Sequence, residues 1–153
     1  MNPLFAERQS VSLAFGRGFV GGVDVDEFSA GFSLLTSGSK SDKLSLAFNL
    51  FDTDNDGFLK RRSVWKFLRS FLTALACLSS QCAVMQQDSV QQMVDAGAVD
   101  ITAHVFLVSE RDHEDRISFD AFGTWYNQGG YKRAPWLEPL DHSKWLLAHP
   151  ASV

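Results

Sequence analysis

Cysteine and proline are scarce in this sequence, which contains two cysteines and four prolines among 153 residues. The spacing of Cys77 and Cys82 matches no metal-binding motif, and no pair of histidines lies nearby. Two small core residues on one predicted helix are therefore a better interpretation than a disulfide or a metal pair. Because disulfides are rare in reducing compartments, this cysteine usage favours a cytoplasmic protein.

Long apolar runs and an excess of positive charge are also absent. The longest apolar stretch, residues 71–78, is much shorter than the roughly 20 residues that a membrane-spanning helix needs. The N-terminus lacks the apolar region of a secretory signal, and Asn2 stands where myristoylation requires glycine. The formal net charge of −4 provides no attraction for nucleic acid or an anionic membrane. We therefore expect no nucleic-acid partner and no membrane insertion.

No pattern typical of a catalytic site is present in the sequence. The four histidines are scattered, and none lies in a nucleophile or metalloprotease arrangement. The glycine cluster at residues 16–22 lacks the lysine that follows the glycines of a phosphate-binding loop. The sequence therefore predicts a protein that is not an enzyme.

The strongest motif is the stretch DTDNDGFLKRRS at residues 52–63. A calcium-binding EF-hand loop has oxygen ligands at positions 1, 3 and 5, a glycine at 6, a backbone carbonyl at 7 and a bidentate glutamate at 12. Those positions hold Asp52, Asp54, Asp56, Gly57, Phe58 and Ser63. Apolar residues at helical spacing flank the loop on both sides, so we predict a helix before it and a helix after it.

Two further stretches are degenerate versions of this loop. Residues 16–27 keep Glu27 at position 12 but have no acidic residue at positions 1, 3 and 5, so we predict no metal there. Residues 110–121 have acidic residues at positions 1, 3 and 5, but Asp115 replaces the glycine and Ala121 replaces the glutamate. We predict at most a weak metal site there, and its three acidic residues are Glu110, Asp112 and Glu114.

The three loops resemble those of the EF-hand superfamily, especially its calcineurin B and neuronal calcium sensor branch, over about residues 4–126. The resemblance implies an all-α fold of helix-loop-helix repeats, in which two loops join through a short antiparallel contact at position 8. We predict that Val23 pairs with Leu59, which leaves Ile117 to pair with the irregular segment 79–100 or with another chain. An unpaired strand edge favours self-association of the isolated protein.

Metal binding at residues 52–63 is expected to be weak. Calcium prefers six to eight oxygen ligands, and Ser63 offers one hydroxyl where the glutamate would supply two oxygens. Three basic residues, at 60–62, also offset the charge of the three aspartates. We predict a Ca²⁺ dissociation constant of ~10⁻⁴ to 10⁻³ M or weaker, with Mg²⁺ as a competitor.

Three regions follow from these assignments. Residues 1–76 form two paired hands, residues 77–128 form a linker helix and a third hand, and residues 129–153 form an apolar segment with Trp136 and Trp145. EF-hand lobes bind amphipathic helices in an apolar groove. The last segment therefore fills the protein's own groove, docks on a partner through its tryptophans, or packs as an extra core helix.

The functional hypothesis is a non-enzymatic, calcium-sensor-like regulatory protein that acts through a protein partner or a target helix. Two alternatives stay open at this point. One is a metal-independent scaffold subunit that keeps the hands as architecture, and the other is a regulatory segment of a larger enzyme.

Overall fold

Helices dominate the structure, a computed structural model that describes residues 25–33 and 36–140. The predicted all-α fold with a short strand contact is confirmed. In chain order, the elements are α2 (Val25–Phe32), α3 (Lys40–Phe51), β1 (Phe58–Lys60), α4 (Arg61–Leu78), α5 (Ser80–Ala83), α6 (Gln87–Val108), β2 (Arg116–Ser118), α7 (Phe119–Trp125), the π-helix η2 (Tyr126–Gly130), α8 (Tyr131–Arg133) and the 3₁₀-helix η3 (Pro135–Leu140).

The helices on both sides of residues 52–63 lie where the apolar periodicity predicts them. Helix α3 begins with a capping box, in which the Ser39 hydroxyl accepts from the backbone N–H of Asp42 and the Asp42 carboxylate accepts from that of Ser39. Helix α4 begins directly after β1 and buries four apolar residues at helical spacing: Val64, Phe67, Leu68 and Phe71. The local helix-loop-helix unit is therefore confirmed.

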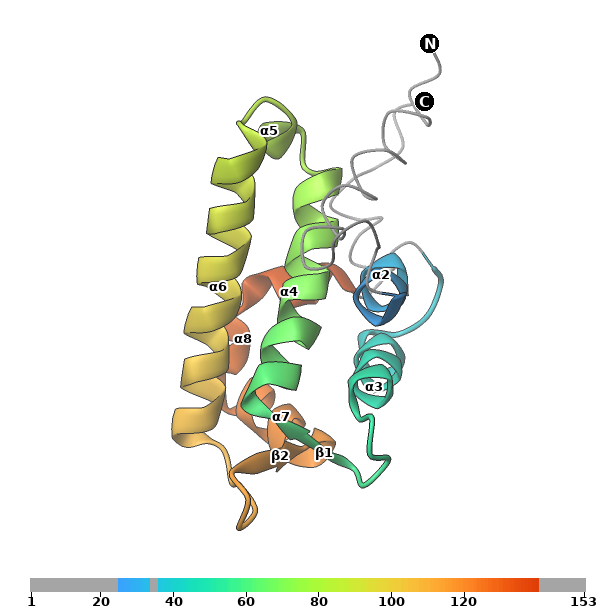
Figure 1. Ribbon diagram of the computed structural model, residues 1–153, viewed down its shortest axis with the longest axis vertical. Coiled ribbons are helices and arrows are strands. Elements are labelled where there is room, and N and C mark those ends of the chain that lie inside the picture. The colour runs from blue at the N-terminus through green and yellow to red at the C-terminus, as the bar shows by residue number, and fades with distance from the viewer. Residues whose placement is uncertain (1–24, 34–35, 141–153) are drawn as a thin grey trace.

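A second helix-loop-helix unit is formed by α6, residues 109–118 and α7. Helix α7 has an N-cap at Ser118, whose hydroxyl accepts from the backbone N–H of Ala121. Helices α4 and α6 pack side by side along their length, and the turn around α5 joins them at one end (Figure 1). Because of this hairpin, the two loops meet at the opposite end, where β1 and β2 lie.

The strand contact joins the second and third loops, so the predicted pairing of Val23 with Leu59 is wrong. Strands β1 and β2 are antiparallel, and Leu59 lies opposite Ile117. The antiparallel return of α6 along α4 brings these two position-8 residues together, whereas Val23 lies outside the described residues. Ile117 therefore has a partner within the chain, which removes the basis for the expected self-association. The division at residues 1–76, 77–128 and 129–153 stays a prediction, although this contact crosses its first boundary.

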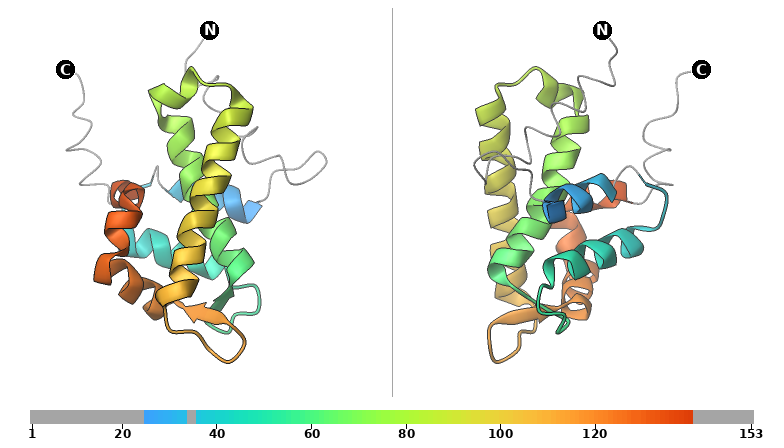
Figure 2. Two further views of the ribbon diagram at one scale, coloured as in Figure 1. Left: turned by 90° about the vertical axis from the view of Figure 1, so that its left-hand side faces the viewer. Right: turned by 45° about the vertical axis from the view of Figure 1, so that its right-hand side comes forward.

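The described part of the C-terminal segment packs into the core. Leu137 and Leu140 of η3 are fully buried, and η3 contacts α3 and α4. Gly129 has a φ of 131°, a conformation that favours glycine, and it lies between the helical turns where the chain bends. Figure 2 shows α8 and η3 turning back against the helices. Residues 134–140 thus pack against the apolar core of their own chain and cover part of α3 and α4.

The two cysteines lie on two different helices, so the prediction that one helix carries both is wrong. Cys77 is near the end of α4 and Cys82 is in α5, and both are free and half-buried. Burial raises the pKa of the Cys77 thiol, and the charge of Cys82 adds to this effect. A half-buried thiol with a raised pKa, as at Cys77, is typical of a small packing residue with little thiolate at neutral pH.

Among residues 25–33 and 36–140, no helix has the length and apolar character that crossing a membrane requires.

Candidate metal centre in the paired EF-hand loops

The loop at residues 52–63 keeps the turn of a calcium-binding loop. The Asp52 carboxylate is nearly buried and accepts from the backbone N–H groups of Asp56, at 3.2 Å, and Gly57, at 2.8 Å. Asn55 and Gly57 have φ values of 52° and 81°, which short polar residues and glycine tolerate. The Asp56 carboxylate accepts from the N–H of Phe58 at 3.1 Å. The loop's own hydrogen bonds therefore set its shape.

The other predicted ligands lie around this turn without converging. Asp54 is exposed, and Ser63 is half-buried in the first turn of α4, at the position of the missing glutamate. Within residues 25–33 and 36–140, no three acidic, histidine or cysteine side chains come together as a metal-ligand group. The fit to a metal is therefore partial, because the backbone turn is present while the carboxylates are not gathered.

The loop at residues 110–121 folds in the same way although it has lost its glycine. Asp115 has a φ of 59° and takes the left-handed conformation that Gly57 has in the other loop. Aspartate adopts this conformation more readily than most residues, which explains why the turn survives the replacement. The Asp112 carboxylate accepts from the backbone N–H groups of Glu114 and Arg116, both at 2.9 Å, whereas Glu110 and Glu114 are exposed.

The Arg116 side chain joins the two loops. Its Nε and Nη2 atoms lie 2.8 and 2.7 Å from Asp112 Oδ2, and its Nη1 donates to Asp56 Oδ2. The guanidinium also lies over the Phe58 ring, 5.2 Å from its centroid. Desolvation raises the pKa of Asp112, but the hydrogen bonds and charge of Arg116 outweigh it and hold this pKa below its usual value. An arginine thus holds one carboxylate from each loop.

Sequence reasoning missed Arg116, because position 7 of an EF-hand loop contributes a backbone carbonyl and its side chain is not read as functional. The available signal was a basic residue, Arg116, inside the acidic loop 110–121. That signal has a meaning only once the pairing of the loops is known.

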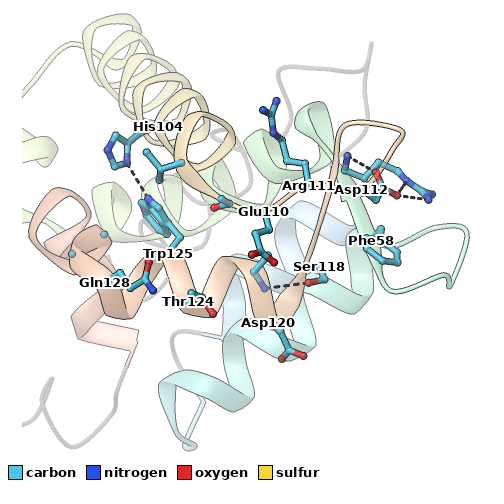
Figure 3. A pocket seen from close by; sticks show the side chains of 16 residues that line it. Phe58, His104, Glu110, Arg111, Asp112, Ser118, Asp120, Thr124, Trp125 and Gln128 are labelled. Carbon is cyan, nitrogen blue, oxygen red and sulfur yellow. Dashed lines mark hydrogen bonds and ion pairs between the residues drawn. The ribbon is translucent and has the colours of Figure 1, made fainter.

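A pocket of about 900 Å³ lies beside the third loop (Figure 3). Residues from α6, the loop, α7 and η2 line it, including Glu110, Thr124 and Gln128. At one end the Trp125 indole donates from Nε1 to His104 Nδ1 at 2.9 Å. His104 therefore orients a tryptophan there, and this contact gives no indication of nucleophile activation.

Comparison with known proteins gives the same assignment as the loops. No protein-family model matches the chain, and no solved structure matches it. The calcineurin B subunit of Schizosaccharomyces pombe is 27% identical over 122 residues, which are 79% of this chain and 59% of the relative. The type 2 calcineurin B subunit of Mus musculus is 30% identical over 103 residues, which are 67% of this chain and 48% of the relative. Calaxin of Homo sapiens is 27% identical over 99 residues, which are 65% of this chain and 41% of the relative.

The chain belongs to the EF-hand superfamily. Within it, the chain resembles the calcineurin B and calcium sensor branch, with degenerate loops. It spans about half the length of the curated relatives that it matches.

A second arginine holds Glu27, an acidic residue in the first turn of α2. Glu27 is the last residue of the predicted loop 16–27, of which residues 16–24 lie outside the described part. Its Oε2 accepts from Arg69 Nη1 at 2.7 Å, and both side chains are nearly buried. Arg69 Nε also donates to Asp95 Oδ1 on α6 at 2.7 Å. Arg69 of α4 therefore links Glu27 of α2 to Asp95 of α6.

The two tryptophans predicted to bind a partner lie in different parts of the C-terminal segment. Trp136 is half-buried and packs against the core, and Trp145 lies outside the described residues. Polar contacts hold η3 in place beside Trp136. Lys40 Nζ lies 2.7 Å from Glu138 Oε1 and 3.2 Å from the Tyr126 hydroxyl, which also donates to Glu138.

Proposed function

We propose that this chain is a non-enzymatic EF-hand regulatory protein of the calcium-sensor type, which acts through a protein partner. The observation that carries this proposal is the pairing of two EF-hand loops through Leu59 and Ile117. The likeness to the calcineurin B subunit, calaxin and a recoverin family protein of Dictyostelium discoideum supports it. A cytoplasmic location is part of the proposal.

The proposed metal site is the loop at residues 52–63, which would bind Ca²⁺ weakly and Mg²⁺ in competition. The side chains of Asp52, Asp54 and Asp56, the carbonyl of Phe58 and the hydroxyl of Ser63 would supply its oxygens. Bound calcium would supply the positive charge that draws these oxygens together. The acidic residues at 110, 112 and 114 would form at most a second, weaker site.

Partner binding is proposed for the C-terminal segment, through Trp136 and Trp145. Leu137 and Leu140 anchor the described part of this segment in the core, while the Trp136 side chain at its edge stays partly accessible. A half-exposed indole next to a fixed anchor can contribute apolar area to a complex at little cost in conformational entropy.

Calorimetric titration with calcium tests the metal site, and affinity capture with and without calcium tests the partner. We expect wild type to capture a partner that a Trp136→Ala, Trp145→Ala double variant does not capture. The circular dichroism of the double variant should equal that of wild type. Equal capture by the double variant would argue against the tryptophans as the contact.

A metal-independent scaffold subunit is the second candidate function. It is favoured by the two arginines that hold carboxylates of the EF-hand loops, Arg116 with Asp56 and Arg69 with Glu27. The titration separates it from the first candidate, since a scaffold would capture its partner equally with and without calcium. The full-length transcript would test the remaining alternative, a regulatory segment of a larger enzyme.

A further inference from the structure

Arg116 contacts Asp56, which lies 60 positions before it in the sequence. It lies on β2, opposite Lys60 of β1, and its guanidinium reaches across the sheet to the other loop. Only 13% of the Arg116 side chain is exposed, and the Asp112 side chain is equally covered. Figure 3 shows Asp112 and Phe58 near each other at the junction of the two loops. Arg116 is therefore a fixed part of this junction.

The charges at the junction explain why a cation belongs there. Asp112 and Asp56 occupy positions 3 and 5 of their loops, which in an EF-hand supply carboxylate ligands. Without a positive charge, two carboxylates from facing loops repel each other. A guanidinium is always protonated and presents a planar fork of donors, so it can bind both carboxylates at once. The Glu114 carboxylate, 3.4 Å from Arg116 Nε, adds to the negative surroundings.

Arg116 and a metal ion at residues 52–63 would draw on the same carboxylate, that of Asp56. One carboxylate oxygen accepts from the backbone N–H of Phe58, and the other accepts from Arg116. Each carboxylate oxygen has a second lone pair, so a metal at residues 52–63 that takes Asp56 Oδ2 would share this oxygen with the Arg116 guanidinium and weaken their contact. The guanidinium, held nearby by Asp112, would also repel a divalent cation.

We propose that Arg116 is a built-in cation of the paired loops, which holds them together without metal and competes with divalent metal for Asp56. The competition rests on the proposed weak metal site, whereas the cross-link rests on the contacts of Arg116 with Asp112 and Asp56. Arg116 thus lowers metal affinity by a route that is separate from the missing glutamate at position 12.

The test compares Arg116→Gln with the matched variant Arg111→Gln. Both substitutions remove one positive charge from the same loop, but Arg111 pairs with Asp115, at 2.6 Å, and Arg116 pairs with Asp112 and Asp56. Calcium is the probe, titrated by calorimetry into wild type and both variants at one ionic strength. We expect Arg116→Gln to bind at least about fivefold tighter than wild type, and Arg111→Gln to change the affinity less than about twofold, because exposed charges are screened.

The metal-free proteins provide a second readout, the urea midpoint in the presence of a chelator. We expect a lower midpoint for Arg116→Gln than for Arg111→Gln, because only the first substitution breaks the cross-link. If Arg116→Gln binds calcium no tighter than Arg111→Gln does, the competition is overturned, even if the proposed metal site is real. Equal midpoints of the two variants overturn the cross-link.

Failure of the proposed metal site gives a different result. Wild type, both variants and Ser63→Glu would then all fail to bind calcium at millimolar concentration. That outcome overturns the metal site and the competition together, and the midpoints without metal still decide whether Arg116 holds the loops.

Discussion

Leu59 and Ile117 lie opposite each other in the antiparallel sheet, and their exposed fractions are 1% and 0%. Each belongs to a different EF-hand loop, so their contact makes the second and third hands one folding unit.

Shortening Leu59 should destabilise both hands. Leu59→Ala leaves a cavity between the loops, and we expect a loss of about 2–4 kcal/mol in the free energy of unfolding. The control is Leu46→Ala on the outer side of α3, where the side chain is 53% exposed. Urea denaturation measures both variants, and equal small losses would contradict a shared core at the sheet.

Restoring the glutamate at position 12 should restore calcium affinity. We expect wild type to bind no tighter than ~10⁻⁴ M and Ser63→Glu to bind at least tenfold tighter, a gain of about 1.4 kcal/mol. Asp52→Ala should abolish binding in both backgrounds, with circular dichroism as the control for folding. Micromolar binding by wild type in the presence of Mg²⁺ would show that Ser63 is replaced by another ligand.

Removing residues 134–153 should expose the apolar surface that Leu137 and Leu140 cover. We expect increased binding of an apolar fluorescent dye and a greater tendency to aggregate. The control is removal of residues 141–153 alone, which keeps the described part of the segment. If the 134–153 and 141–153 truncations bind the dye equally, η3 does not cover the apolar surface.

The Tyr126 hydroxyl reports whether η3 is docked. Burial raises the pKa of Tyr126 well above its ordinary range, and the Glu138 hydrogen bond and charge raise it further. In a Tyr131→Phe variant, Tyr126 is the only tyrosine, and its absorbance titration should lie well above the usual pKa of about 10. Glu138→Gln should move the titration downward, and a wild-type-like curve in that variant would argue against the contact.

The stabilising effect of Arg116 should depend on pH through Asp112. The pKa of Asp112 in the folded protein is below 3.8, its usual value, so the paired carboxylate stabilises the fold above pH 3.8. This stabilisation is lost as the pH falls through the lower pKa of the folded state. The urea midpoints of wild type and Arg116→Gln should therefore differ at neutral pH and converge in strong acid. A difference that persists there would mean that Arg116 acts through packing alone.

Local features of the fold were predictable from the sequence, whereas the long-range contacts were not. The aspartates at alternate positions before Gly57, with apolar residues at helical spacing on both sides, identify a helix-loop-helix because each signal acts within a few residues. The pairing of Leu59 with Ile117 depends on how α6 returns along α4. No periodicity within either helix carries that information.

The arginines at the candidate site illustrate the same limit. Arg69 and Glu27 are 42 positions apart, and their ion pair requires that α2 and α4 pack together. The sequence indicated which carboxylates an EF-hand would direct at a metal. It did not show that guanidinium groups from distant positions reach two of them.

The docking of η3 also affects how any partner can use this protein. Because η3 is tethered by its own chain to the apolar surface that it covers, it acts as an intramolecular ligand with an effective concentration of about millimolar or higher. A free helix that targets the same surface must displace η3. Its intrinsic association constant is then multiplied by the fraction of time in which η3 leaves this surface open. A partner that binds the outer edge of the docked segment, next to Trp136, avoids this competition altogether.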